Sequence, residues 1–223
     1  MILTDDNFLT IVKAISNGRS IYANIKNAIK FLLSGNAGAI FVVLYATFLA
    51  LPVPFTPVHL LFINLLTDSL PAIAIGLEPH NQKLMKEKPR NIQEPLLNRK
   101  FAIRVGLEGL VIAAVTIIAF QIGLSSGDPV VGSTMAFATL CLVRLFHGFN
   151  CRAEQSIFKL GIFSNITVWI AFLLGVTLLN AVLIAGWFET ATLSHLQLTI
   201  VYGLAVIPLI IIQLERFLFG KDK

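Results

Sequence analysis

Charged residues are scarce in this chain of 223 residues. Only 13% of its positions are Asp, Glu, Lys or Arg, while 56% are hydrophobic. A soluble globular domain carries charge at about 25% of its positions, so the composition argues against that class and predicts an integral membrane protein. Cysteine is also rare, because Cys141 and Cys151 are the only two. They permit one disulfide at most, and we expect both to be free thiols.

In place of charged residues, the chain contains long apolar segments. Six of them approach or exceed the roughly 20 residues that a helix needs to cross a bilayer. The predicted fold is therefore an all-α integral membrane protein, with six transmembrane helices in three hairpins. The predicted spans are residues 31–51, 58–77, 102–123, 130–149, 164–186 and 196–218.

The basic residues predict the direction of these spans. Of the 17 Lys and Arg residues, only Arg104, Arg144 and Arg216 fall inside a predicted span. All the others lie on one side of the predicted membrane, in residues 1–30, 78–100, 150–160 and 219–223. By the positive-inside rule both termini are cytoplasmic. The net charge of +5 thus follows from topology, so we expect the lipid bilayer and no nucleic acid as a partner.

The segment before the first span has a helical pattern of isoleucines over residues 7–30, with a break near Asn17 and Gly18. A helix from about residue 19 would continue into the first span and leave the membrane as a cytoplasmic stalk. Its apolar stripe predicts a soluble partner that covers it.

Asp68 lies near the centre of the second predicted span. A carboxylate there costs about 3 kcal/mol on insertion scales, which makes it a candidate functional residue. Asn64 and Thr67 precede it by four and one positions, so the three side chains are predicted to share one helix face. Pro71 has no N–H and removes the helical partner of the Thr67 carbonyl. This all-oxygen set suits a hard cation such as calcium.

Other polar residues support simpler interpretations. Asn36 lies in a patch of small residues, Ser34, Gly35, Gly38 and Ala39, that predicts close contact between helices. From its surroundings alone, Asn36 fits interhelical hydrogen bonding as well as ion binding. Arg104 and Glu108 are four residues apart and predict a local ion pair. His147 is expected to be structural, and Glu78 to lie at the membrane boundary.

Three segments resemble the C-terminal membrane part of calcium-transporting P-type ATPases. They are D-D-N-F-x-T-I-V from Asp5, G-R-x-I-Y-x-N-I-K from Gly18, and N-L-L-T-D-S-L-P-A-I-A-I-G-L-E-P from Asn64. The resemblance covers essentially the whole chain and is strongest over residues 3–79. It implies a phosphorylation-domain hinge and stalk helix (1–30), a six-helix transport domain (31–218) and a cytoplasmic tail (219–223).

The resemblance also implies that Ca²⁺ is the transported ion. The residues that it implies as ligands are Asn36, Asn64, Thr67 and Asp68. Pumps with two calcium sites carry glutamates at the positions that match Ala39 and Arg144, and these two departures imply a single calcium site. Arg144 is a permanent cation that either fills the vacant site beside Asp68 or Asn36, or extends to the cytoplasmic interface.

The sequences that perform ATP chemistry in this family are absent. No D-K-T-G-T, T-G-E-S or G-D-G-x-N-D string occurs, so we assign no catalytic or nucleotide-binding residue. ATP and Mg²⁺ would act only in the complete pump. We expect the chain alone to be inactive, as a fragment or split gene product whose partner is an N-terminal pump half in a bacterial-type plasma membrane.

Two alternatives remain open. The chain fits a pump part for another cation, such as Na⁺, K⁺ or Mn²⁺. It also fits a stand-alone six-helix channel or regulatory membrane subunit without ATPase activity.

Overall fold

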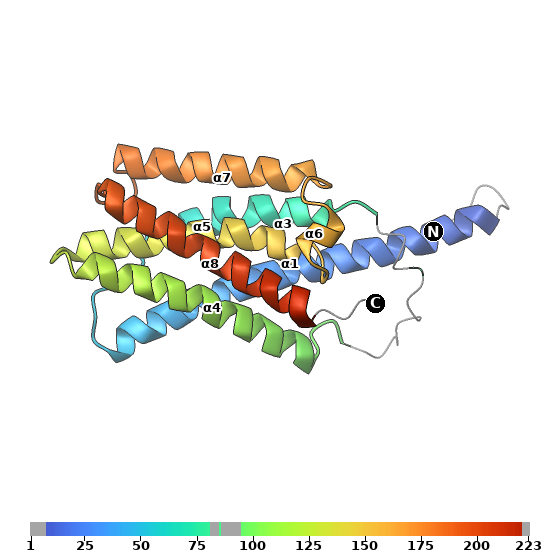
Figure 1. Ribbon diagram of the computed structural model, residues 1–223, viewed down its shortest axis with the longest axis horizontal. Coiled ribbons are helices and arrows are strands. Elements are labelled where there is room, and N and C mark those ends of the chain that lie inside the picture. The colour runs from blue at the N-terminus through green and yellow to red at the C-terminus, as the bar shows by residue number, and fades with distance from the viewer. Residues whose placement is uncertain (1–7, 81–84, 86–94, 220–223) are drawn as a thin grey trace.

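The computed structural model describes residues 8–80, 85 and 95–219, and over these ranges its regular secondary structure is all helical (Figure 1). The elements are α1 (Phe8–Phe48), α2 (Pro57–Phe62), the π-helical η1 (Ile63–Asp68), α3 (Ser69–Gly76), α4 (Arg99–Leu124), α5 (Pro129–Cys151), α6 (Ile157–Leu160), α7 (Ile166–Ala185) and α8 (His195–Phe219). Six segments of the described chain are long and apolar enough to cross a membrane, with α2, η1 and α3 forming one of them. The predicted all-α fold with six spans is confirmed. Residues 1–7 of the predicted hinge and stalk segment (1–30) and residues 220–223 of the predicted tail (219–223) lie outside the described residues.

The first helix is continuous from Phe8 to Phe48. At 1.5 Å per residue its 41 residues extend about 60 Å, which exceeds the roughly 30 Å hydrocarbon core of a bilayer. The predicted break near Asn17 and Gly18 is wrong. Ser16 and Ser20, on either side of it, hydrogen-bond the two ring nitrogens of His80 at 2.9 and 2.8 Å. This bridge offsets the cost of about 1 kcal/mol for a helical glycine.

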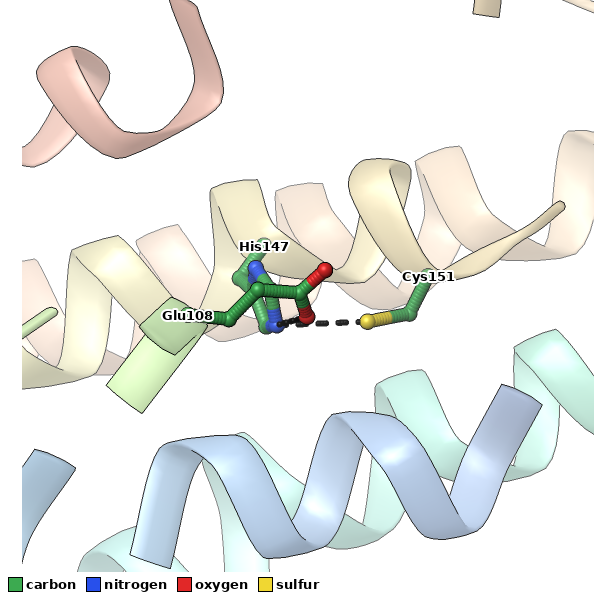
Figure 2. Close-up of side chains that lie close together, drawn as sticks. All are labelled: Glu108, His147 and Cys151. Atoms are coloured by element: carbon green, nitrogen blue, oxygen red, sulfur yellow. Dashed lines mark hydrogen bonds and ion pairs between the residues drawn. The ribbon is translucent and has the colours of Figure 1, made fainter. Parts of the chain in front are cut away.

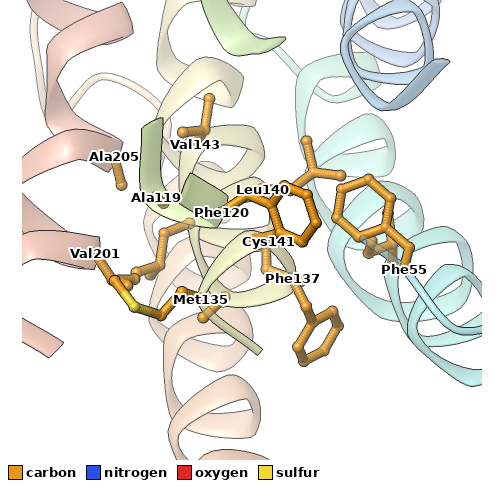
Figure 3. Packing of buried hydrophobic residues seen from close by; sticks show 14 of the residues in the cluster. Phe55, Ala119, Phe120, Met135, Phe137, Leu140, Cys141, Val143, Val201 and Ala205 are labelled. Carbon is orange, nitrogen blue, oxygen red and sulfur yellow. The ribbon is translucent and has the colours of Figure 1, made fainter. Parts of the chain in front are cut away.

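The helix at the centre of the bundle is α5. Its N-cap is Asp128, whose side chain accepts a hydrogen bond from the Val130 amide at 2.8 Å. Most of its residues are buried, and its side chains form much of the main hydrophobic core, including Phe137 and Leu140 (Figure 3). The helices α1, α4, α7 and α8 all pack against it. Polar residues on α5 are therefore placed in the interior of the protein.

Each predicted hairpin consists of two spans that are consecutive in the chain, but the hairpins differ in how closely their two helices pack. The helices of the α4–α5 hairpin pack closely, because Gly123 and Gly132 face each other without side chains. By contrast, α7 packs mainly against α3 and α5, and α8 packs mainly against α5 and α4. The two helices have few contacts with each other, among them a hydrogen bond from the Asn180 amide to the Tyr202 hydroxyl. Figure 1 shows α7 above the bundle and α8 crossing it obliquely.

Candidate functional site

The membrane segment that carries Asp68 is a helix with a π-helical turn in its middle. This turn, η1, ends at Asp68 itself. Pro71 follows three residues later, where its ring and its missing N–H oppose a regular α-helical turn through Thr67. Within the wider turn, the Thr67 hydroxyl donates to the Ile63 carbonyl at 2.9 Å. Turns of this type are frequent at functional sites. The sequence predicts disruption by the proline, but not this form of it.

The carboxylate of Asp68 is buried and is bound on one side. The residue is 4% exposed, and its Oδ2 lies 2.8 Å from Nη2 of Arg144 in α5. Its Oδ1 has no hydrogen-bond partner within the described part of the chain. A buried charged oxygen without a partner is unfavourable. Oδ1 is therefore the atom of this site that is best suited to bind a further group.

Arg144 connects three elements of the bundle. The same Nη2 donates to Oδ1 of Asn36 in α1 at 2.7 Å, so the guanidinium lies between α1, η1 and α5. Arg144 is 1% exposed. The alternative in which its side chain extends to the membrane boundary is wrong. Its partners, Asp68 and Asn36, are two of the residues predicted to bind the ion.

A glycine of α1 makes room for this arginine. A Cβ atom at Gly35 would lie 2.4 Å from Nε and 2.8 Å from Cζ of Arg144. Any side chain at this position would push the guanidinium away from Asn36 and Asp68. The sequence pattern identified Gly35 only as a helix-packing residue. Its second role depends on which residue of a distant helix faces it, and no local signal reports that.

The four predicted ligands differ in how exposed they are. Thr67 and Asp68 are buried, whereas Asn36 and Asn64 are exposed. The shared face predicted for Asn64, Thr67 and Asp68 is therefore not observed, because a π-helical turn changes the angular spacing on which the prediction relied. Ala39 is half-buried and packs against the main hydrophobic core. Its methyl group provides no oxygen to an ion.

A second polar cluster lies between α4 and α5 (Figure 2). Nε2 of His147 lies 3.4 Å from Glu108 Oε2, 3.2 Å from Cys151 Sγ and 2.8 Å from Ser34 Oγ. Carboxylate, imidazole and thiol are possible metal ligands, and these three are close enough to share an ion.

The charges around Glu108 do not favour such an ion. Arg104 Nε lies 3.2 Å and Arg216 Nη2 lies 3.6 Å from its Oε1. Two arginines already exceed the charge of one carboxylate, and a divalent cation would add to the excess. The Arg104–Glu108 pair was predicted and is confirmed. We interpret the cluster as a structural link between α1, α4, α5 and α8.

A third polar cluster links α3 to the start of α7. Arg152 contacts both oxygens of Glu78, through Nε at 3.0 Å and Nη2 at 2.7 Å. Asn165 donates to Glu78 Oε2 at 2.7 Å and to the Ala74 carbonyl at 3.1 Å. The Glu78 side chain is 7% exposed. The prediction that Glu78 lies at the membrane boundary did not include this buried ion pair with Arg152.

Residues 52–218 match a family model described as "Cation transporting ATPase, C-terminus". The chain belongs to this family. It corresponds to the C-terminal membrane part of calcium-transporting P-type ATPases, as the motifs around Asn64 and Asp68 implied.

The relatives are longer proteins. The chain is 39% identical over 214 residues to a calcium-transporting ATPase of Bacillus subtilis, covering 93% of this chain and 24% of that protein. It is 38% identical over 226 residues to one of Listeria monocytogenes, covering 99% and 26%. For calcium-transporting ATPase type 2C member 2 of Mus musculus the values are 32% over 229 residues, 98% and 24%. The chain spans about a quarter of the length of these curated relatives.

Proposed function

We propose that this chain is the ion-translocation part of an ATP-driven calcium pump, and that Asp68 binds the transported ion through Oδ1. One observation carries the proposal. A buried membrane carboxylate has one oxygen fixed by Arg144 and the other without a partner among the described residues. The pair leaves Asp68 oriented and keeps one oxygen for a cation. Hard cations such as Ca²⁺ bind oxygen ligands of this kind.

The proposed ligands come from two elements. Asn36 of α1 and Asn64 of η1 are the exposed members, and Thr67 and Asp68 are the buried ones. Calcium takes six to eight oxygens, so four side chains do not complete a shell. The remaining ligands would come from other helices of the pump.

We propose one calcium ion per transport cycle. The guanidinium of Arg144 contacts Asn36 and Oδ2 of Asp68, and its positive charge opposes a second calcium ion beside the one proposed at Oδ1. Ala39 offers no oxygen there. We also propose that the basic connections, and with them both termini, face the cytoplasm, and that the part of α1 before residue 31 forms the stalk. ATP and Mg²⁺ would act on the cytoplasmic domains of the complete pump.

The test uses the complete pump, reconstituted in vesicles, with Asp68→Asn as the variant. We expect its apparent calcium affinity to fall at least tenfold, because the amide removes the negative charge that binds the ion; tenfold corresponds to about 1.4 kcal/mol. Asp128→Asn is the matched control, since asparagine also caps a helix well and this residue begins α5 away from the site. Equal calcium affinity in both variants would overturn the ligand assignment.

The same vesicles test ion number and selectivity. The ratio of calcium transported to ATP hydrolysed is expected to be one, and a ratio of two would contradict the role of Arg144 and Ala39. Competition by Mn²⁺, Na⁺ and K⁺ would show whether the transported ion belongs to another class.

A further inference from the structure

A basic cavity lies where α1 and α4 meet the connection between α5 and α6. Its volume is about 230 Å³. The charged residues that line it are Lys26, Lys30, Lys100, Arg104 and Glu154. All of them lie at the ends of predicted spans, on the side of the membrane that carries the basic connections. The cavity is separate from Asp68, and nothing in the proposed calcium transport uses it.

The positive charge in this cavity is only partly compensated. Arg104 is paired with Glu108 at 3.2 Å and with Glu215 at 3.7 Å. Lys26, Lys30 and Lys100 form no ion pair with any described residue, and the one acid among the lining residues is Glu154. Lys30 is only 3% exposed. The Glu108 carboxylate that attracts Lys30 is shared with Arg104 and Arg216. The cavity therefore keeps an excess of positive charge and is suited to an anionic ligand.

The packing of α1 and α4 explains why a cavity exists here. The two helices touch at Gly38 and Gly109, where a Cβ on Gly109 would lie 3.1 Å from the Ser34 carbonyl and 3.3 Å from the Gly38 nitrogen. From this close contact they diverge toward the start of α4 (Figure 1). Phe101 fills part of the space between them, and its ring lies 5.9 Å from the Lys26 ammonium. The remaining space has basic walls.

Exposed apolar side chains continue from the cavity toward the membrane. On α4, Ile103 is 53% and Leu107 is 59% exposed, one and two turns beyond Lys100. On α1, Leu33 is 40% exposed, one turn beyond Lys30. A free phosphate would use the lysines alone. A phospholipid would use the lysines through its phosphate and this apolar surface through its acyl chains.

We propose that this cavity binds the phosphate headgroup of an anionic phospholipid. Basic pockets between transmembrane helices bind anionic headgroups in this way. Lys26 and Lys100 contact the phosphate from two helices, and Lys30 provides the buried charge. The lipid joins α1 to α4 at the end where their own contact is open.

The experiment measures lipid binding by the full chain in mild detergent, using native mass spectrometry. Phosphatidylglycerol and phosphatidylcholine with the same acyl chains are titrated separately. The test variant is the double substitution Lys26→Gln and Lys100→Gln. The matched control is Lys13→Gln with Arg99→Gln, which removes the same charge from exposed positions of the same two helices that do not line the cavity.

We expect wild type to bind phosphatidylglycerol in preference to phosphatidylcholine. Each basic residue near a membrane surface contributes about 1 kcal/mol toward anionic lipid, so the test variant should bind phosphatidylglycerol roughly 30-fold more weakly, and the control should match wild type. An equal loss in both variants would overturn the proposal in favour of diffuse charge attraction. Displacement of the lipid by excess inorganic phosphate would overturn it in favour of a phosphate site. Neither result depends on calcium transport, so this proposal and the proposed function fail separately.

Discussion

Two buried arginine–carboxylate pairs in this protein differ in how completely their atoms are bound. Arg152 and Glu78 make two contacts, at 3.0 and 2.7 Å, where α3 meets the start of α7. Arg144 and Asp68 make one, at 2.8 Å, in the middle of the membrane segment. All four groups are nearly excluded from solvent. Each pair consists of one arginine and one carboxylate, so the difference in their bonding comes from the residues that surround them.

The surroundings complete one pair and leave the other open. Arg152 also donates to the carbonyls of Gly161 and Ile162 and to the Ser164 hydroxyl, and Asn165 binds Glu78. In the second pair, Oδ1 of Asp68 and Nε of Arg144 have no hydrogen-bond partner in the described chain. A fully bonded polar network makes a structure rigid. An incomplete one retains the capacity to bind another group, which is what an ion-transport site requires.

The largest expected effect comes from breaking the complete pair. Arg152→Gln should lower the free energy of unfolding by about 3–5 kcal/mol, because it leaves the Glu78 carboxylate buried without its cation. Arg144→Gln should cost less, since fewer hydrogen bonds are lost with it. Denaturation of both variants in the same detergent measures the difference. A larger loss for Arg144→Gln would contradict the comparison, and Arg99→Gln, at an exposed position, provides the baseline.

The next effect tests the space that Arg144 occupies. Gly35→Ala should destabilise the chain by about 1–3 kcal/mol, because the added methyl overlaps the guanidinium and forces it to move. Gly18→Ala is the matched control in the same helix. Apart from the backbone of its own helix, no atom of the described residues lies within 4 Å of its added Cβ, so it should stabilise the helix by about 0.5–1 kcal/mol. If thermal unfolding shows the same change for both, the proposed fit between Gly35 and Arg144 is incorrect.

The sequence predicts those residues of the site that have a local signal, and it does not predict contacts between residues far apart in the chain. Asp68 is recognisable alone, because a carboxylate in a long apolar segment is unfavourable unless it is used. The spans are equally local, since length and composition define them. Gly35 and Arg144 meet across more than a hundred residues, and no helical period relates them. The exposure of Asn64 also escaped prediction, because the α-helical spacing assumed for it does not hold in a π-helical turn.

The smallest expected effect compares the asparagines at the two pairs. Asn165→Ala removes the donor to Glu78 and also the acceptor of the Thr167 amide at the start of α7. It should cost about 1–2 kcal/mol, as for loss of a helix cap. Asn36→Ala removes one acceptor from Arg144, which keeps its ion pair with Asp68, and should cost less than about 1 kcal/mol. In the complete pump the order should reverse for calcium affinity, because Asn36 is a proposed ligand and Asn165 is not. Measuring stability and calcium affinity for both variants therefore separates a residue that holds the fold from one that binds the ion.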